Sequence, residues 1–198
     1  MENMEKGYKV IFLGESAVGK TTLIKISVGK TFDLESPPTL MASYFTKNYR
    51  YNNHNYTFCL WDTIGNEKYR SLTRMFYKDS KIVILVYDIT SKKSFNALDY
   101  WYEEVINELG EEIILAIVGN KSDLFLEEQV SFEEGQKYAE MKNALFKLSS
   151  AKNEAEYFIN FLEELFKEYI KKYLNKKNTI NKKSKSLNKK KPSKKPCC

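Results

Sequence analysis

Residues 8–21, YKVIFLGESAVGKT, decide the fold of this chain. The first six are almost all apolar, which is typical of a strand buried on both faces of a parallel sheet. The next eight match GxxxxGK(S/T), a glycine-rich turn between a strand and a helix whose backbone N–H groups face a polyphosphate. Lys20 would add positive charge there and Thr21 would ligate Mg²⁺. An ordinary glycine turn is the alternative, but the spacing, the Lys-Thr pair and the preceding strand together favour phosphate binding. The residues predicted to surround the phosphates are Gly14, Glu15, Ser16, Ala17, Val18, Gly19, Lys20, Thr21 and Thr22.

Further strands are predicted on both sides of this motif. Two more continuously apolar runs, 82–87 and 113–118, have the composition of buried parallel strands. Residues 43–50 and 56–61 flank the polar loop 51–55, so they predict an antiparallel hairpin at one edge of the sheet.

Helices are predicted between and after the strands. Apolar residues at helical spacing favour helices over 94–109, 131–142 and 153–173, with Phe132, Tyr138 and Met141 as the apolar residues of the second. Strands that alternate with helices indicate an α/β fold. We therefore expect a P-loop NTPase sandwich, with a mostly parallel sheet, one antiparallel edge hairpin and helices on both faces.

A second motif, Asn120-Lys121-Ser122-Asp123, follows the last of the three apolar runs, where a sheet of this type presents ligand contacts. The Asp123 carboxylate only accepts hydrogen bonds, so it can take both the N1–H and the 2-amino hydrogens of guanine. Adenine offers neither donor and would leave the carboxylate unpaired, at a cost of about 1–3 kcal/mol. A strand-ending turn is the alternative, because Asn, Ser and Asp all suit turns.

Five segments, GESAVGKT, WDTIGNEKYRSL, YDIT, GNKSDL and SSAK, resemble the Ras-like small GTPases in their order and approximate spacing. The resemblance covers residues 8–173. Within that superfamily, WDTIGNEKYRSL, RMFYKDS and the terminal Cys-Cys are most similar to the Rab branch, and TLMASYF is similar to the switch region of endosomal Rabs. The resemblance implies a GTP/GDP molecular switch that uses Mg²⁺, hydrolyses GTP and recruits effectors to intracellular membranes in vesicle trafficking.

The resemblance also implies roles for residues outside the two motifs. Thr39 would ligate Mg²⁺ and the γ-phosphate, Asp62 would hold the metal through water, and the Gly65 N–H would contact the γ-phosphate. Phe32 would stack edgewise on the guanine, although without the flanking motifs it could be a core residue and Thr39 a turn residue. The implied metal ligands are thus Thr21, Thr39 and, through water, Asp62. The base site would be completed by Asn120, Lys121, Asp123, Ser150, Ala151 and Lys152.

Two positions depart from the family pattern at the hydrolytic step. Asn66 stands where the family has its water-orienting Gln, and Ile64 stands where it has a small Ala. Asn is one methylene shorter than Gln, and a misplacement of about 1 Å can cost roughly a hundredfold in rate, so we expect slow intrinsic hydrolysis. The residues implied at the hydrolytic centre are Asn66, Lys20, Thr39 and Gly65.

Trp61 occupies the position where Rab-like proteins expose an aromatic side chain between the two switch segments. Together with Phe45 and Tyr77 it resembles their effector-reading triad. The alternative for Trp61 is an ordinary place in the core, since aromatic side chains are usually buried.

Charge divides the 198 residues into a body and a tail. Residues 171–198 hold 12 of the 32 basic residues and no acidic residue, so residues 1–170 hold 20 basic residues against all 26 acidic ones. We expect one folded domain over 1–174 and a disordered lysine-rich tail over 175–198, whose few apolar residues cannot offset the entropy of ordering it. Positive charge on a tail and not on a folded face argues against nucleic acid as a partner.

The last two residues, Cys197 and Cys198, are predicted lipidation sites. Two lipid chains give stable membrane anchoring where one gives marginal affinity, so adjacent cysteines on a flexible basic segment suit double lipidation. The resemblance implies two geranylgeranyl groups, and an unmodified, solvated end is the alternative. Because no apolar run approaches the roughly 20 residues of a membrane-spanning helix, we expect a lipid-anchored protein. It would lie on the cytoplasmic face of intracellular membranes, with the endosome favoured by TLMASYF.

The implied partners are a guanine exchange factor, a GTPase-activating protein, a GDP-dissociation inhibitor and effectors that read the switch regions, with the chain itself monomeric. Three other functions stay open on the sequence alone: a P-loop kinase, a Ras- or Rho-like signalling switch, and a module that binds GTP but scarcely hydrolyses it. The NKSD motif argues against the kinase, and a Ras or Rho protein would usually end in a CaaX box.

Overall fold

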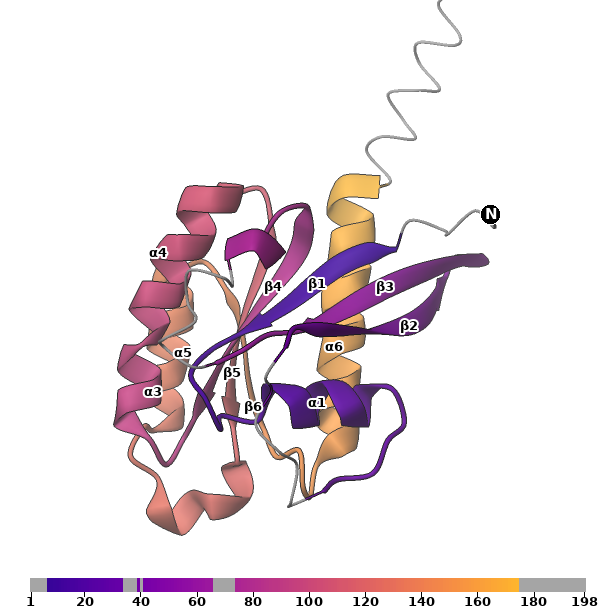
Figure 1. The fold of residues 1–198 in the computed structure, drawn as a ribbon. Helices are drawn as coiled ribbons and strands as arrows, with labels where there is room; N and C mark the ends of the chain where they lie inside the picture. Colours follow the sequence, from indigo (N-terminus) through magenta and orange to yellow (C-terminus); the bar gives the residue numbers. More distant parts are fainter. Residues whose placement is uncertain (1–6, 34–38, 40, 66–73, 175–198) are drawn as a thin grey trace, which may run out of the picture.

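A computed structural model of the chain describes residues 7–33, 39, 41–65 and 74–174. Its centre is a six-stranded sheet with the order β2-β3-β1-β4-β5-β6 (Figure 1). All neighbouring strands are parallel except β2 and β3, which form an antiparallel hairpin at one edge. The predicted fold class is therefore confirmed. The strands are β1 Tyr8–Leu13, β2 Ser43–Tyr51, β3 His54–Asp62, β4 Ser80–Asp88, β5 Ile114–Asn120 and β6 Leu145–Ser149.

Helices cover both faces of this sheet. Successive residues of β1 alternate between the two faces, with Val10 and Phe12 in one buried cluster and Ile11 and Leu13 in the other. The first cluster is completed by α1 and α6, and the second by α3, α4 and α5, which lie on opposite sides of the sheet in Figure 1. The helices are α1 Lys20–Ser27, α3 Lys92–Asn96, α4 Leu98–Leu109, α5 Phe132–Met141 and α6 Ala155–Tyr169. Shorter helical turns are η2 Arg74–Phe76, η3 Ser122–Glu127 and η4 Ile170–Leu174.

The hairpin is longer than predicted, because its loop is only two residues long. Tyr51 pairs with His54, which leaves Asn52 and Asn53 as the turn. Both asparagines have positive φ, 48° and 61°. A two-residue hairpin turn whose twist matches that of its strands requires positive φ at both positions. Asn tolerates that conformation better than most residues, which explains why Asn52 and Asn53 can form the turn. The polar loop predicted over 51–55 is therefore a tight turn of two residues.

Strand β6 was not predicted. Its sequence, LFKLS, carries a lysine in the middle and is only partly buried, so it lacks the continuous apolar run of the other parallel strands. It lies at the sheet edge and pairs only with β5 in the described part of the chain. An edge position explains the mixed composition, since one side of an edge strand needs no neighbour.

The predicted helices exist, with two differences in detail. The first is divided into α3 and α4 and begins at Lys92, because the Ser91 side chain accepts a hydrogen bond from the Ser94 N–H and caps the helix earlier than expected. In α5, Phe132 and Met141 are 47% and 66% exposed, so they are not the packing residues that we predicted. Among the described residues, no helix combines the length and apolar character that a bilayer crossing requires.

Candidate nucleotide and metal site

The loop after β1 can adopt its path only with glycine at two positions. Gly14 has φ 145°, and a Cβ atom added to it would overlap the carbonyl oxygen of Val86. Gly19 has φ 98°, and a Cβ atom there would overlap the side-chain nitrogen of Asn120. Both φ values lie in the region that favours glycine. The loop therefore lies directly against the carboxyl ends of β4 and β5, with α1 starting at its last turn.

Lys20 points into this loop from the first turn of α1. Its ammonium donates hydrogen bonds to the carbonyl oxygens of Gly14 at 2.9 Å and Glu15 at 2.8 Å. The residue is only 5% exposed, and this burial lowers the pKa of the ammonium to about 8, although Asp62 and Glu15 act in the opposite direction. An anion can further stabilise a buried cation that carbonyl oxygens of this loop hold in place.

Three side-chain oxygens meet beside Lys20. The Thr21 hydroxyl donates to Asp62 Oδ2 at 2.7 Å and lies 2.8 Å from the Thr39 hydroxyl, which also reaches Asp62 Oδ2 at 3.3 Å. The other carboxylate oxygen of Asp62 is buried and has no hydrogen-bond partner among the described residues. Burial raises the pKa of this carboxyl, which the hydroxyl hydrogen bonds and Lys20 partly counteract.

This oxygen cluster fits a magnesium ion. Mg²⁺ prefers hard oxygen ligands and is commonly held by one or two protein groups together with water and phosphate oxygens. A buried carboxylate oxygen without a partner is expensive, and a cation would satisfy it. When bound, the ion would neutralise charge on the phosphate groups of a nucleotide, while Thr21, Thr39 and Asp62 position it.

The backbone at Gly65 closes the phosphate side of the site. A Cβ atom at Gly65 would overlap the Lys20 ammonium and lie 2.5 Å from the Glu15 carbonyl oxygen, so only glycine allows this approach. The neighbouring Ile64 is half-buried. The predicted hydrolytic residue Asn66 lies outside the described residues.

Asn120, the last residue of β5, joins two loops at the other end of the site. It is 2% exposed, and its side-chain amide donates to the Val18 carbonyl oxygen at 2.8 Å and accepts from the Ala151 N–H at 3.3 Å. One side chain thus links the phosphate loop to the SSAK segment. Val18 and Asn120, which share the first of these bonds, are 102 residues apart in the sequence.

Asp123 and Ser150, both predicted at the base, are in direct contact. The Ser150 hydroxyl donates to Asp123 Oδ1 at 2.6 Å and accepts from the Asn153 N–H at 3.0 Å. Asp123 is half-buried. The hydrogen bond from Ser150 holds one of its carboxylate oxygens and so orients the carboxylate. This arrangement suits a carboxylate that receives paired donors from a planar base.

Lys121 has a partner that the sequence reasoning did not identify. Its backbone is left-handed, with φ 67°, and its ammonium lies 2.6 Å from Asp88 Oδ2. Asp88 also accepts from the Thr90 N–H and hydroxyl, which fixes its carboxylate. The signal was present in YDIT, a segment quoted for the resemblance but given no role. Asp88 therefore positions Lys121.

The remaining predicted contacts lie at the rim. Phe32 is half-buried and packs against the core on the α1 and α6 side, while Lys152 is exposed. Thr22 lies on α1, partly buried, and Ser16 and Ala17 are exposed on the phosphate loop. The site thus lies at the carboxyl ends of the strands, as expected for a parallel sheet.

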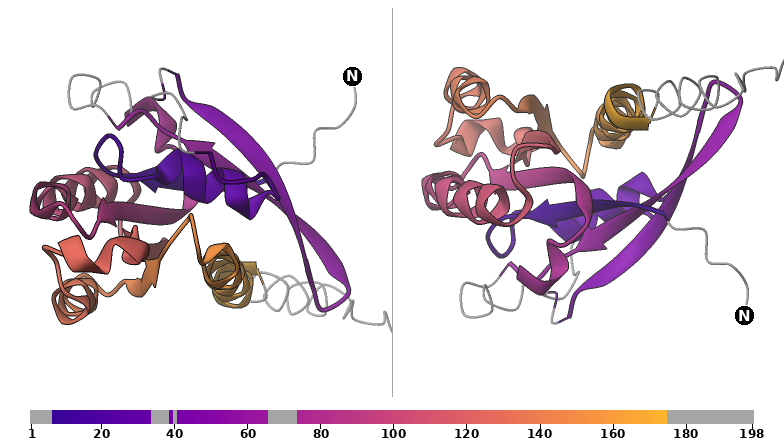
Figure 2. Two further views of the ribbon diagram at one scale, coloured as in Figure 1. Left: turned by 90° about the horizontal axis from the view of Figure 1, so that it is seen from below. Right: turned by 90° about the horizontal axis from the view of Figure 1, so that it is seen from above.

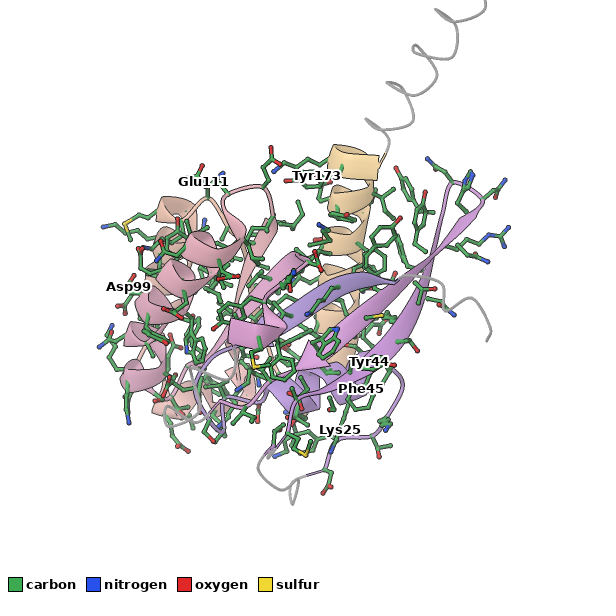
Figure 3. All side chains as sticks on the ribbon, turned by 45° about the horizontal axis from the view of Figure 1, so that its top comes forward. Lys25, Tyr44, Phe45, Asp99, Glu111 and Tyr173 are labelled. Carbon is green, nitrogen blue, oxygen red and sulfur yellow. The ribbon has the colours of Figure 1, made fainter. Side chains whose placement is uncertain are left out.

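The aromatic cluster around Trp61 differs from the predicted triad. Tyr44 stacks on Trp61 with 5.3 Å between ring centroids, and Phe76 lies 5.8 Å away. Tyr77 is fully buried, and its resemblance to a member of the effector-reading triad stays a prediction. Phe45, next to Tyr44 on the same strand, points to the opposite face and packs, partly buried, against the cluster of α1 and α6. Figure 3 labels Tyr44 and Phe45 side by side on β2.

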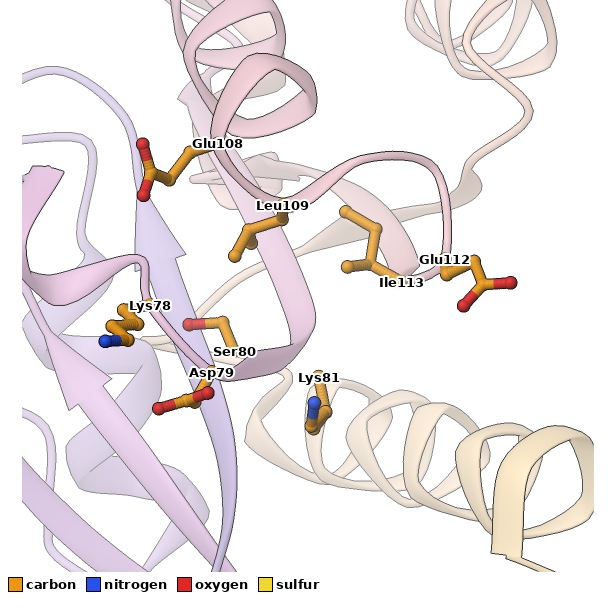
Figure 4. A pocket seen from close by; sticks show the side chains of 8 residues that line it. All are labelled: Lys78, Asp79, Ser80, Lys81, Glu108, Leu109, Glu112 and Ile113. Carbon is orange, nitrogen blue, oxygen red and sulfur yellow. The ribbon is translucent and has the colours of Figure 1, made fainter. Parts of the chain in front are cut away.

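A separate pocket of about 490 Å³ lies between the start of β4 and the end of α4 (Figure 4). Lysines and carboxylates surround its apolar residues Leu109 and Ile113. None of the predicted site residues lines it. The pocket is at the amino ends of β4 and β5, whereas the nucleotide loops follow their carboxyl ends.

The fold and the phosphate loop define a P-loop protein. The model of the Ras family matches residues 9–175, and the chain belongs to this family. Ras-family proteins bind GTP and GDP with Mg²⁺ and hydrolyse GTP, which removes the kinase alternative.

Similar proteins narrow the assignment within the family. Ras-related protein Rab-21 of Bos taurus is 39% identical over 167 residues, which cover 84% of this chain and 73% of that protein. Ras-related protein Rab-22A of Homo sapiens is 39% identical over 145 residues, which cover 73% of this chain and 75% of that protein. The protein is therefore a Rab-type GTPase, a molecular switch of vesicle trafficking, as the motifs indicated.

Proposed function

We propose that this chain binds GTP and GDP with Mg²⁺ through the residues assembled above. The observation that carries the proposal is the meeting of the Thr21, Thr39 and Asp62 oxygens beside the buried Lys20 ammonium. Lys20 balances phosphate charge, the three oxygens hold the metal, and the loop from Gly14 to Thr22 supplies N–H donors. Asp123 reads the guanine, with Ser150 holding its carboxylate in place.

The switch follows from where Thr39 and Gly65 lie. Both belong to segments that the γ-phosphate and its Mg²⁺ would tie to the phosphate loop, so hydrolysis releases both and changes the binding surface. Tyr44, Trp61 and Phe76 form an aromatic cluster between these segments. Effectors, an exchange factor and an activating protein read this region, and a GDP-dissociation inhibitor extracts the GDP form.

Slow hydrolysis is the second part of the proposal. Asn66 is too short to orient the attacking water as Gln does, and a branched Ile64 beside Gly65 crowds the γ-phosphate side. The half-buried position of Ile64 next to the close approach of Gly65 and Lys20 supports the crowding argument. At the limit of this effect the protein is a GTP-binding module that scarcely hydrolyses.

Membrane attachment completes the proposal. Cys197 and Cys198 carry two lipid chains, and the lysines of residues 175–198 reach an anionic leaflet. The monomeric protein acts on the cytoplasmic face of intracellular membranes, and the similarity of TLMASYF to endosomal Rabs favours the endosome.

The direct test is to identify the nucleotide that copurifies with the protein by chromatography, where we expect GDP or GTP. Asp123→Asn should then weaken GTP and favour xanthosine triphosphate, whose C2 carbonyl accepts a hydrogen bond from the new amide. Glu127→Gln is the matched control, because Glu127 is exposed on the same helical turn. An adenine nucleotide in the purified protein, or unchanged GTP affinity in Asp123→Asn, would contradict the assignment of the base site.

A further inference from the structure

An unbroken row of aromatic rings connects the hairpin turn to the end of α6. His54 lies 6.5 Å from Tyr56, Tyr56 lies 6.3 Å from Tyr8, and Tyr8 lies 5.3 Å from Tyr169, all between ring centroids. Tyr169 lies 5.3 Å from Tyr173 in the last helical turn before residue 175. Four of these five rings belong to tyrosine, a residue with an apolar body and a polar tip.

The charge of this region is opposite to that of the body. Residues 40–61 contain Lys47 and Arg50 but no Asp or Glu, in a body that carries six more acidic than basic residues. At the end of α6, Lys171 pairs with Glu168 at 3.0 Å, and Lys172 lies over the Tyr173 ring at 5.2 Å. Lys47 lies 3.8 Å from Glu163, so two of these lysines are partly neutralised, and Arg50 and Lys172 are the further basic residues of the region.

The β2–β3 hairpin and the end of α6 form one surface. The Tyr49 ring of β2 lies 5.7 Å from the Phe166 ring of α6, between ring centroids. Figures 1 and 2 show the hairpin turn and the end of α6 at the same end of the molecule. We call this surface the hairpin pole: Arg50, Tyr51, His54, Tyr56, Lys172 and Tyr173.

The hairpin pole is remote from the nucleotide. β3 runs from His54 at the pole to Asp62 in the site, and nine residues of extended strand span about 30 Å. Residues 175–198 continue directly from Tyr173 and Leu174 at this pole. A membrane held by that segment would therefore meet the hairpin pole, with the Thr39 and Gly65 segments turned away from it.

We propose that the hairpin pole lies on an anionic lipid bilayer and orients the GTPase domain on the membrane. Tyrosine is enriched where protein meets the headgroup region, and a basic residue near an anionic leaflet contributes about 1 kcal/mol. The pole offers the exposed Arg50, His54 and Lys172 to that interface, with the partly buried rings of Tyr51, Tyr56 and Tyr173 beside them. The proposal rests on the proposed membrane attachment through the tail.

The test uses the full, unlipidated chain with vesicles of phosphatidylserine in phosphatidylcholine, measured by sedimentation. The variant Arg50→Gln with Lys172→Gln should bind roughly thirtyfold more weakly than the parent, the equivalent of about 2 kcal/mol. The control, Lys93→Gln with Lys137→Gln, removes the same charge from exposed positions on α3 and α5 and should bind within about twofold of the parent. Equal loss in the two double variants, or no binding of the parent to anionic vesicles, overturns the proposal.

A second measurement reads orientation directly. With a paramagnetic lipid in the vesicles, amide signals of residues 50–56 and 171–173 should broaden, while those of residues 120–123 should not. Uniform broadening would leave the tail as the sole contact and refute an oriented surface. The GDP affinity of both double variants should equal that of the parent, so loss of nucleotide binding would reveal a folding defect. Mass analysis of Cys197 and Cys198 in protein from cells tests whether lipid chains are attached there. If no lipid is found, the vesicle comparison of the unlipidated chain stays valid.

Discussion

Replacing Asn120 with Ala tests whether one side chain holds the nucleotide loops together. Asn120 is buried and bonded to the Val18 carbonyl oxygen and the Ala151 N–H. Each such bond contributes about 1 kcal/mol net, and each buried partner left unsatisfied costs about 1–3 kcal/mol. We expect Asn120→Ala to lower the free energy of unfolding by about 2–4 kcal/mol, less than the stability of an ordinary domain.

Gly19 supplies a sharper version of the same test. A Cβ atom at Gly19 would overlap the Asn120 amide, so Gly19→Ala suffers both a steric conflict and the cost of its left-handed backbone. In an Asn120→Ala background the conflict disappears while the backbone cost stays. The double variant should therefore be about 1–2 kcal/mol more stable than the sum of the single changes predicts.

Urea unfolding measures these energies, once without nucleotide in EDTA and once with excess GDP and Mg²⁺, because bound ligand adds its own stabilisation. Asn96→Ala is the control, since Asn96 is exposed and its change should stay within about 0.5 kcal/mol. Additive energies for Gly19 and Asn120, or an Asn120→Ala cost no larger than the control, would refute the reasoning.

Three further predictions concern hydrolysis, anchoring and charge. Asn66→Gln should raise single-turnover GTP hydrolysis without an activator, and Ile64→Ala should raise mainly the response to an activating protein; a parent rate equal to that of Gln-containing relatives would clear both residues. Deleting Cys197 and Cys198 should move the protein to the soluble fraction of cells with GDP binding unchanged, and an unmodified C-terminus in membrane-bound protein would contradict lipid anchoring. Burial lowers the pKa of Lys20 from 10.5 to about 8, so between these pH values the unfolded chain binds more protons. The stability of the nucleotide-free protein relative to Lys20→Met should then rise from pH 8 to 10.5, and a flat difference would contradict this burial.

The central parallel strands β1, β4 and β5 and the phosphate loop were predictable because their signals are local. A continuous apolar run fixes a doubly covered strand, and the spacing of the glycines with Lys20 fixes the loop. The aromatic cluster was not predictable in the same way. Choosing Phe76 over Tyr77, or Tyr44 over Phe45, requires knowing which of two neighbours points outward. On a strand or tight turn that choice depends on register, and polarity cannot decide it when both residues are aromatic.

Register also explains why the site's contacts depend on the whole sheet. Asp88 pairs with Asn120 across β4 and β5, and Asn120 pairs with Ser149 across β5 and β6. Residues proposed to surround the nucleotide thus lie at the ends of adjacent strands, directly before Lys121 and Ser150. A slip of one residue between two strands would turn these side chains to the opposite face and separate Lys121 from Asp88. The buried apolar faces that exclude such a slip are therefore what positions the base site.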